Sequence, residues 1–145
     1  MKDNSALLVS ARPRAALPGV AAPMSPARYL QLRRRAAGLT VDQAAERLVS
    51  AERDRREVRA MIRLLETPGT VARLRATIDT LAEAIPLDPD VYRQIATDPV
   101  DRHPPICRGC GCSHNDPCHI GNDHICRMLA GEPAVCTRCT NGEWR

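Results

Sequence analysis

The chain has 145 residues, a length typical of a single domain, yet its composition changes sharply along that length. Aromatic residues make up only 2% and Phe is absent, so any core must be built from smaller apolar side chains, and a bound metal is a favoured further source of stability. The formal net charge of +4 lies within residues 1–100, where any attraction to a polyanion is therefore expected. No apolar run is long enough to cross a membrane, which favours a cytoplasmic protein without a membrane partner.

Residues 1–24 are rich in Ala, Pro and Arg and predict a flexible N-terminal arm. The apolar stretch at residues 6–9 is too short for a secretory signal and is followed by Arg12 and Pro13. We therefore expect no signal peptide. An arm lying along a DNA groove is the alternative interpretation.

Five helices are predicted between residues 25 and 97. Ser25 and Pro26 mark the start of the first helix, and Gly38 marks its end. Thr40 opens the second helix, where Gln43 completes a capping box. The third helix is expected over about residues 51–66 with Ser50 as its N-cap. Its predicted buried stripe consists of Val58, Met61 or Ile62, and Leu65.

Two further helices and a linker follow. Thr70 is predicted to cap the fourth helix, and Asp88 with Pro89 starts the fifth. The proline-rich residues 98–106 are expected to form a semi-rigid linker, in which His103 is not counted as a metal ligand. The expected core positions of the two helices are Val71, Leu74, Ile78, Leu81, Ile85, Val91 and Ile95.

Residues 32–48, centred on Gly38-Leu39-Thr40, resemble the opening of lambda-repressor/Cro-like helix-turn-helix domains, the Xre family. Residues 62–69 are similar to the segment that ends the recognition helix of that family, so the resemblance covers residues 25–97. The chain departs from the pattern at Val41, where the family often has a phosphate-binding Gln, and at residues 50–58, which predict a longer third helix. The resemblance implies a small five-helix domain that binds double-stranded DNA as a homodimer.

Arginines recur along the predicted third helix. Arg55, Arg59 and Arg63 are spaced every four residues, an arrangement suited to phosphates and to guanine edges in a major groove. The alternative is a solvated face in which Glu52 and Arg56 form an ion pair. Together with the helix-turn-helix pattern, the stripe favours DNA contact. The candidate DNA-binding residues are Arg53, Arg55, Arg56, Arg59, Arg63, Thr40 and Gln43.

All seven cysteines lie in residues 107–145, which we interpret as a loop-rich zinc module. Cys107-x2-Cys110 and Cys136-x2-Cys139 can supply four thiolates to one tetrahedral Zn²⁺. The remaining three cysteines are one ligand short of a second site, which His114, His119 or His124 could complete. We include His119 among the candidate ligands. The sequence thus predicts one Zn²⁺ site and leaves a second open, with the further ligands Cys112, Cys118, Cys126 and His119.

A disulfide framework is the alternative use of these cysteines. Their number is odd, they are confined to one end of the chain, and no signal peptide is expected, so zinc is favoured. A closed four-thiolate site leaves no coordination position open for water, so we expect a structural metal and no enzymatic activity.

The Cys-rich module resembles one found in small phage and prophage proteins, although Met128 stands where that pattern has a Trp. The fold class expected is mainly α, with a five-helix helix-turn-helix domain joined to the zinc module. The function expected is sequence-specific DNA binding in a bacterial or phage transcriptional regulator. One alternative is an adaptor whose zinc module binds another protein. A second is a metal-dependent nuclease using the polar residues of the loop, namely His114, Asn115, Asp116, His119, Asp123 and His124.

Overall fold

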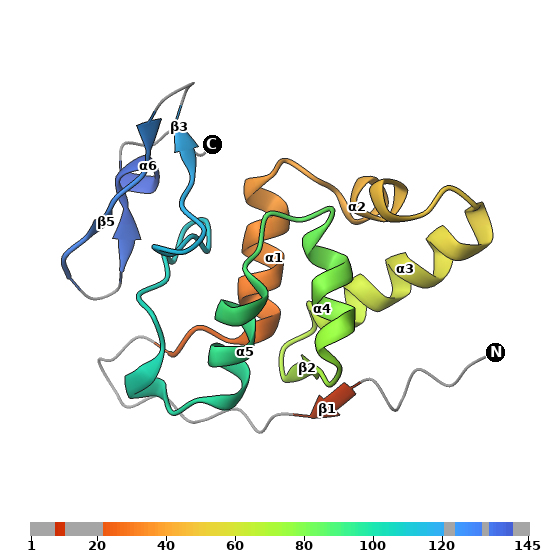
Figure 1. Ribbon diagram of the computed structural model, residues 1–145, viewed down its shortest axis with the longest axis horizontal. Helices are drawn as coiled ribbons and strands as arrows, with labels where there is room; N and C mark the ends of the chain where they lie inside the picture. The colour runs from red at the N-terminus through yellow and green to blue at the C-terminus, as the bar shows by residue number, and fades with distance from the viewer. Residues whose placement is uncertain (1–7, 11–21, 121–123, 132–133, 141–145) are drawn as a thin grey trace.

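The structure, a computed structural model, describes residues 8–10, 22–120, 124–131 and 134–140. The protein is mainly α, as expected, with a small Cys-rich part that follows the helices (Figure 1). The larger helices are α1 (Pro26–Ala36), α2 (Val41–Leu48), α3 (Glu52–Leu65), α4 (Arg75–Ala82) and α5 (Pro89–Thr97).

Local capping signals explain where three of these helices begin. The Ser25 side chain accepts a hydrogen bond from the Arg28 amide at the start of α1. Thr40 and Gln43 form the predicted capping box of α2, each side chain bonding the backbone amide of the other. Asp88 caps α5 ahead of Pro89. These starts were therefore predictable from neighbouring residues alone, which is the reach of a capping interaction.

The start of α3 differs from the prediction. Its N-cap is Ala51, which makes no side-chain capping bond, so Ser50 lies outside the helix and does not cap it. Ile62 and Leu65 are fully buried as expected, and Val58 and Met61 pack against the core from its edge. The helix is thus held by its buried stripe more than by its first turn.

The predicted fourth helix begins later than expected, because residues 70–72 form a strand. This strand, β2 (Thr70–Ala72), pairs antiparallel with β1 (Leu8–Ser10), and α4 starts only at Arg75. Thr70 is therefore not a helix cap, and Leu74 is half-exposed instead of buried. The segment expected to be a flexible arm supplies β1 and also buries Met24 against the helices, while the rest of residues 1–21 lies outside the described residues.

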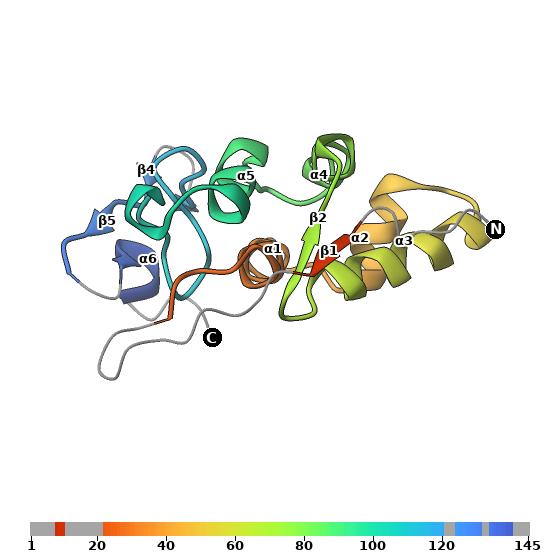
Figure 2. The same ribbon diagram turned by 90° about the horizontal axis from the view of Figure 1, so that it is seen from below.

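One apolar core joins the five helices, and α1 contributes its central residues. Tyr29 and Leu30 of α1 are completely buried, as are Leu81 of α4 and Ile85, which follows that helix. Figure 2 shows α1 between the Cys-rich part on one side and the α2–α3 pair on the other. This helix is therefore the element that both ends of the molecule share.

Arg34 on α1 forms a buried ion pair with Glu66, the residue that ends α3. The guanidinium donates two parallel hydrogen bonds of 2.6 and 2.8 Å to the two carboxylate oxygens. Its third nitrogen donates to the Leu39 carbonyl at 2.7 Å. Such a paired geometry satisfies both buried charges and holds α3 at a defined position on α1.

The segment expected to be a linker continues into the core. It contains a short 3-10 turn, Val100–Arg102, and the His103 ring forms a hydrogen bond with the Asp98 carbonyl. Ile106 is buried in the helical core. The proline-rich stretch therefore packs on the helices, and the Cys-rich part starts in contact with them.

The Cys-rich part contains two small antiparallel pairs and one helical turn. The first pair is β3 (His119–Ile120) with β4 (His124–Ile125), and the second is β5 (Met128–Leu129) with β6 (Val135–Cys136). The turn is α6 (Thr137–Thr140). Among the described residues, no helix is long and apolar enough to cross a membrane.

Candidate metal centre

Six of the seven cysteines are buried together in the Cys-rich part, and Cys139 is partly exposed. All seven cysteines are free, and no disulfide joins any of them in this structure. Their sulfurs replace the apolar core that this short segment lacks. Clustered thiols without disulfides are the donor set of a thiolate metal site.

The sulfurs form two groups of four, in each of which all Sγ atoms lie within 4.8 Å of one another. The first sulfur group is Cys107, Cys110, Cys112 and Cys136. The second sulfur group is Cys112, Cys118, Cys126 and Cys136. Each group could hold a metal ion, and the two groups have Cys112 and Cys136 in common.

Tight backbone turns bring these sulfurs together. The Cys107 amide donates to the Cys112 carbonyl, and the Gly111 amide donates to the Cys107 carbonyl, both at 2.9 Å. Gly111 takes a φ of +76°, a conformation that glycine adopts without strain. Beyond this turn, the Cys126 amide donates to the Cys118 carbonyl at 2.9 Å, next to the β3–β4 pair. Each cysteine is therefore placed by backbone hydrogen bonds close to its own position.

The structure gathers the predicted ligands in a different combination. Cys107, Cys110 and Cys136 come together as the two CxxC motifs predicted, but the fourth sulfur of their group is Cys112. The Cys139 sulfur lies beside Gly109, where a Cβ added to the glycine would come within 2.7 Å of it. Cys139 thus lies next to the first sulfur group without belonging to it. Sequence spacing could not decide whether Cys112 or Cys139 is the fourth ligand, because both cysteines are close enough in the sequence to a CxxC motif to join its site.

No described histidine side chain belongs to either sulfur group. His114 and His119 are exposed on the surface of the Cys-rich part. The His124 side chain and Asp123 lie outside the described residues. The proposed completion of a second site by His119 therefore has no support in the geometry, and cysteines alone supply four sulfurs to each group.

The electrostatics of the cluster favour thiolates at two positions. Hydrogen bonds from the Cys110 and Cys112 thiols stabilise the Cys107 thiolate and hold its pKa well below the usual range. The same two thiols lower the pKa of Cys118, with a further contribution from the Arg33 guanidinium. A metal binds thiolate and not thiol, so the lowered pKa values of Cys107 and Cys118 favour the form that a metal ion needs.

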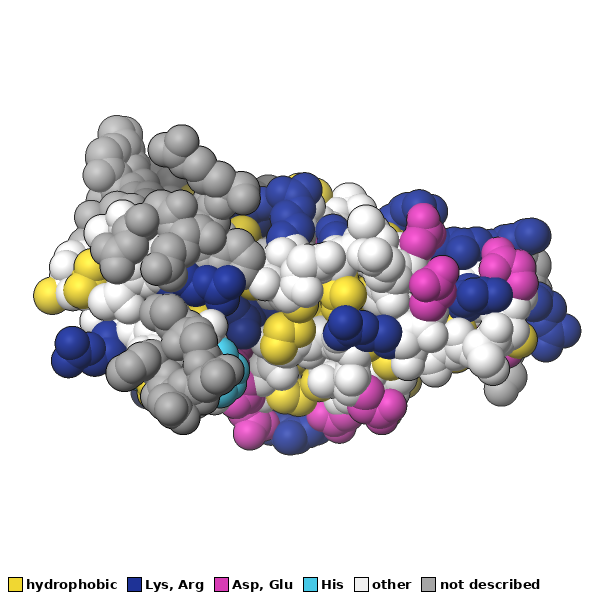
Figure 3. All heavy atoms as spheres, turned by 90° about the horizontal axis from the view of Figure 1, so that it is seen from above, with side chains coloured by type: hydrophobic (Ala, Val, Ile, Leu, Met, Phe, Trp, Pro, Cys, Tyr) yellow, Lys and Arg dark blue, Asp and Glu magenta, His cyan; other side chains and the backbone are white. Residues whose placement is uncertain are grey.

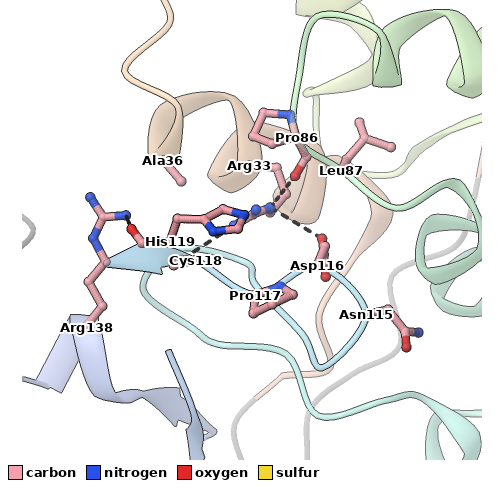
Figure 4. A pocket seen from close by; sticks show the side chains of 10 residues that line it. All are labelled: Arg33, Ala36, Pro86, Leu87, Asn115, Asp116, Pro117, Cys118, His119 and Arg138. Carbon is pink, nitrogen blue, oxygen red and sulfur yellow. Dashed lines mark hydrogen bonds and ion pairs between the residues drawn. The ribbon is translucent and has the colours of Figure 1, made fainter. Parts of the chain in front are cut away.

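The Cys-rich part docks on α1 through Arg33, whose side chain is only 4% exposed (Figure 4). Its guanidinium donates to the Pro86 carbonyl at 2.7 Å and to the Cys110 carbonyl at 3.2 Å, and it lies 3.9 Å from the Cys118 sulfur. Asp116 supplies the countercharge at 3.4 Å. One arginine of the first helix therefore reaches the backbone and a sulfur of the candidate centre.

Tyr29 strengthens the same contact from one helical turn earlier. Its hydroxyl donates to Asp116 at 2.5 Å and accepts from the Asp88 amide at 3.0 Å. Burial raises the pKa of this phenol, and the neighbouring Asp116 carboxylate raises it further, so the hydroxyl stays protonated as a donor. Asp116 also accepts from the Ser113 amide and hydroxyl. Its oxygens are thus committed to structure, which weighs against the role a nuclease would give this carboxylate.

Replacing Gly111 with Ala is expected to destabilise the protein more than replacing Gly38 with Ala. Both glycines have a left-handed φ, +76° and +70°, so each alanine brings strain of about 1 kcal/mol. At Gly111 the new Cβ would also lie 3.0 Å from the Leu32 Cβ and 3.1 Å from the Arg33 Cδ, whereas nothing lies within 4 Å at Gly38. Overpacking adds about 1–3 kcal/mol. Urea denaturation of both variants measures the difference, and equal losses would show that the Cys-rich part does not pack on α1.

The candidate DNA-binding arginines separate into two sets on α3. Arg59 pairs with Glu52 at 3.0 Å and with Asp42 of α2 at 3.4 Å. Arg55 pairs with Glu52 at 3.2 Å and approaches Glu46 of α2 at 4.0 Å. By contrast, the side chains of Arg53, Arg56 and Arg63 are exposed, with Arg53 near Asp54.

Seen from above, basic and acidic side chains alternate over the end of the molecule formed by α2 and α3 (Figure 3). Three acidic residues of α2 and α3, namely Asp42, Glu46 and Glu52, form the ion pairs with Arg55 and Arg59. Thr40 and Gln43 are exposed but already occupied with capping α2. The predicted stripe is therefore divided between arginines that hold α2 to α3 and arginines that face outward.

No protein-family model, curated protein or solved structure matches this chain.

Proposed function

We propose that this protein is a sequence-specific DNA-binding protein, a transcriptional regulator of a bacterium or phage, in which zinc-bound cysteines stabilise the fold. The observation that carries the proposal is the outward-facing set of Arg53, Arg56 and Arg63 on α3. In this proposal α3 enters the major groove, and these guanidiniums contact phosphates and guanine edges.

The arrangement of α2 and α3 supports this role. The two helices are joined by three residues and are held together by the ion pairs of Arg55 and Arg59. These ion pairs fix the orientation of α3, while its outer face stays open for a partner. The Arg34–Glu66 pair anchors the other end of α3 to α1. A recognition helix must be held in a fixed orientation, because its contacts with bases depend on the register of the protein along the DNA.

Zn²⁺ is the metal we propose for the sulfur groups. Buried thiolates in tetrahedral sets of four are typical ligands of Zn²⁺, and a set closed by four sulfurs leaves no position for water. The metal would therefore stabilise the Cys-rich part and take no part in a reaction. Because one recognition helix reads only a half-site, we further propose that the protein binds DNA as a homodimer.

Changing Arg53, Arg56 or Arg63 singly to Gln is expected to weaken specific DNA binding. A lost base contact costs about 1–3 kcal/mol and a lost phosphate contact also lowers the salt dependence of binding. The measurement is fluorescence anisotropy of the zinc-loaded protein on upstream fragments from its own genome and on random duplex, at two salt concentrations. Arg93→Gln on α5, an exposed arginine away from α3, is the control for the change in charge.

Specific binding by a factor of about 10³ over random DNA, reduced by the α3 variants and not by Arg93→Gln, is the expected result. Weak binding to every fragment that disappears with salt would overturn the proposal, since it indicates only a basic surface.

The second candidate is a protein-binding adaptor, and the surface of the Cys-rich part favours it. Ile125 on β4 is 57% exposed, and Leu129 on β5 is 42% exposed. Apolar side chains on a metal-stabilised surface could be covered by another protein. An unspecific result in the DNA experiment would direct attention to this surface.

A further inference from the structure

We propose that the cysteines hold two metal ions in one cluster, with the Cys112 and Cys136 thiolates bridging both ions. This inference deepens the zinc part of the proposed function and does not depend on DNA binding. It differs from the sequence expectation of one four-cysteine site, with a second site left open for a histidine to complete, because it needs no histidine and shares two cysteines between the ions. Cys107 and Cys110 would complete the first ion, and Cys118 and Cys126 the second.

The sharing of sulfurs follows from the two groups. Two four-coordinate ions need eight ligand positions, yet the two groups together contain six different cysteines. The membership of the groups gives two cysteines to each ion alone and two to both. A thiolate sulfur has lone pairs enough to bind two metal ions at once. Two bridging and four terminal thiolates therefore satisfy both ions.

The distances between sulfurs show that the groups are continuous. A tetrahedron of sulfurs about 2.3 Å from a metal has edges of about 3.8 Å. Within the first group the Cys110 and Cys136 sulfurs lie 3.8 Å apart, and within the second the Cys112 and Cys126 sulfurs lie 3.5 Å apart. Between the groups, the Cys110 and Cys118 sulfurs are only 3.3 Å apart. No space separates the groups into two independent sites.

Hydrogen bonding to sulfur distinguishes terminal from bridging positions. The Cys107 sulfur accepts from the Gly109 and Cys136 amides at 3.4 and 3.3 Å, and the Cys126 sulfur accepts from the Cys118 amide at 3.1 Å. In the described part of the chain, no hydrogen bond from nitrogen to the Cys112 or Cys136 sulfur is found. A sulfur that binds two metals has fewer lone pairs left to accept, so the amide donors at Cys107 and Cys126 agree with terminal positions for these two thiolates.

The charge of the cluster explains why Arg33 lies against it. Six thiolates carry two more negative charges than two divalent ions neutralise, and the cluster is buried. The Arg33 guanidinium, 3.9 Å from the Cys118 sulfur, supplies a positive charge at the second ion, and Asp116 restrains its position. Arg33 also pairs with Asp116, so its contact with the Cys118 sulfur adds to an ion pair that is already present.

Native mass spectrometry and ¹¹³Cd NMR of the full chain test the inference. The protein loaded with Zn²⁺ is expected to carry two ions per chain. After exchange with ¹¹³Cd²⁺, two resonances in the range of four-sulfur sites are expected, with a scalar coupling between them, because only a shared ligand transmits that coupling. The unchanged sequence suffices for this experiment, so no variant has to fold for it to be decisive.

Variants locate the bridges. Cys112→Ser is expected to lose the coupling and at least one ion, whereas Cys139→Ser, outside both groups, and His119→Ala are expected to keep two ions and the coupling. Two uncoupled ions, or an ion lost on Cys139→Ser or His119→Ala, would overturn the inference in favour of separate sites. One ion per chain would overturn it and leave the structural zinc proposal intact, whereas no bound metal would overturn both.

Discussion

Removing the metal is expected to unfold the Cys-rich part and to lower the stability of the helices with it. The six buried sulfurs take the place of an apolar core there, so without a metal little else would hold the short strands together. Structural zinc contributes about 10–16 kcal/mol of apparent binding free energy, more than the whole stability of many domains. Circular dichroism and hydrogen exchange before and after a strong chelator measure the loss.

The effect should reverse when Zn²⁺ is added back, and protection should be lost first in residues 107–140. The amides that donate to Cys107 and Cys126 sulfurs, those of Gly109, Cys118 and Cys136, are the sharpest probes. A protein whose exchange pattern and melting temperature stay unchanged after verified metal removal would show that the cysteines are packing residues only. Magnesium supplied in place of zinc is a control, because thiolates bind it weakly.

Replacing Arg33 with Met is expected to destabilise the protein by about 3–5 kcal/mol, since it leaves a buried carboxylate without its partner. Asp116, whose side chain is only 10% exposed, would keep its negative charge beside the cluster. The Pro86 and Cys110 carbonyls would lose their donor as well. Urea denaturation measures the loss, and competition with a chelator measures the expected decrease in metal affinity.

Arg35→Met provides the matched control, because Arg35 is the same residue type on the same helix but exposed. Its replacement is expected to change stability by less than about 0.5 kcal/mol. Similar losses for both variants would contradict the role assigned to Arg33. A large loss of stability with unchanged metal affinity would show that Arg33 acts through its ion pair with Asp116 and that its contact with the Cys118 sulfur does not affect metal binding.

Sequence reasoning was most successful where a structural signal is local. The capping box of Thr40 and Gln43 and the N-cap at Asp88 both depend on residues within three positions of each other. The burial of Ile62 and Leu65 on α3 likewise agrees with their helical spacing. Short-range hydrogen bonds and helical periodicity are written in the sequence itself.

The errors came where a distant segment decides the local structure. Residues 70–72 adopt a strand because β1, more than 50 residues earlier, pairs with them. An amphipathic helix starting at Thr70 was equally compatible with the spacing of Val71, Leu74 and Ile78. The burial of Arg33 gave no signal in the sequence, because its partner Asp116 lies 83 positions away. A sequence shows a charge but not the remote countercharge that makes its burial favourable.

The candidate centre was predictable in kind but not in composition. A density of seven cysteines indicated a metal site, and the two CxxC motifs indicated where three of its sulfurs would meet. The inclusion of Cys112 in place of Cys139, and the sharing of two cysteines between groups, depend on how the turns fold in three dimensions. Sequence spacing limits which sulfurs can share a metal ion. It does not decide which of several nearby cysteines actually do so.

Arg33 and Arg34 are consecutive residues of α1 that point to opposite ends of the protein. Arg33 bonds the Cys-rich part, and Arg34 bonds Glu66 at the end of α3. Both ends of the molecule are therefore attached to the same helix. Loss of either attachment would expose a buried arginine of α1 and weaken the position of the helix on which the other attachment depends. Heating should therefore melt the chain in a single cooperative transition, with equal calorimetric and van't Hoff enthalpies. A fragment that ends before Cys107 would leave Arg33 and Tyr29 exposed to solvent. We expect the helices of this fragment to be less stable than the same helices in the full chain.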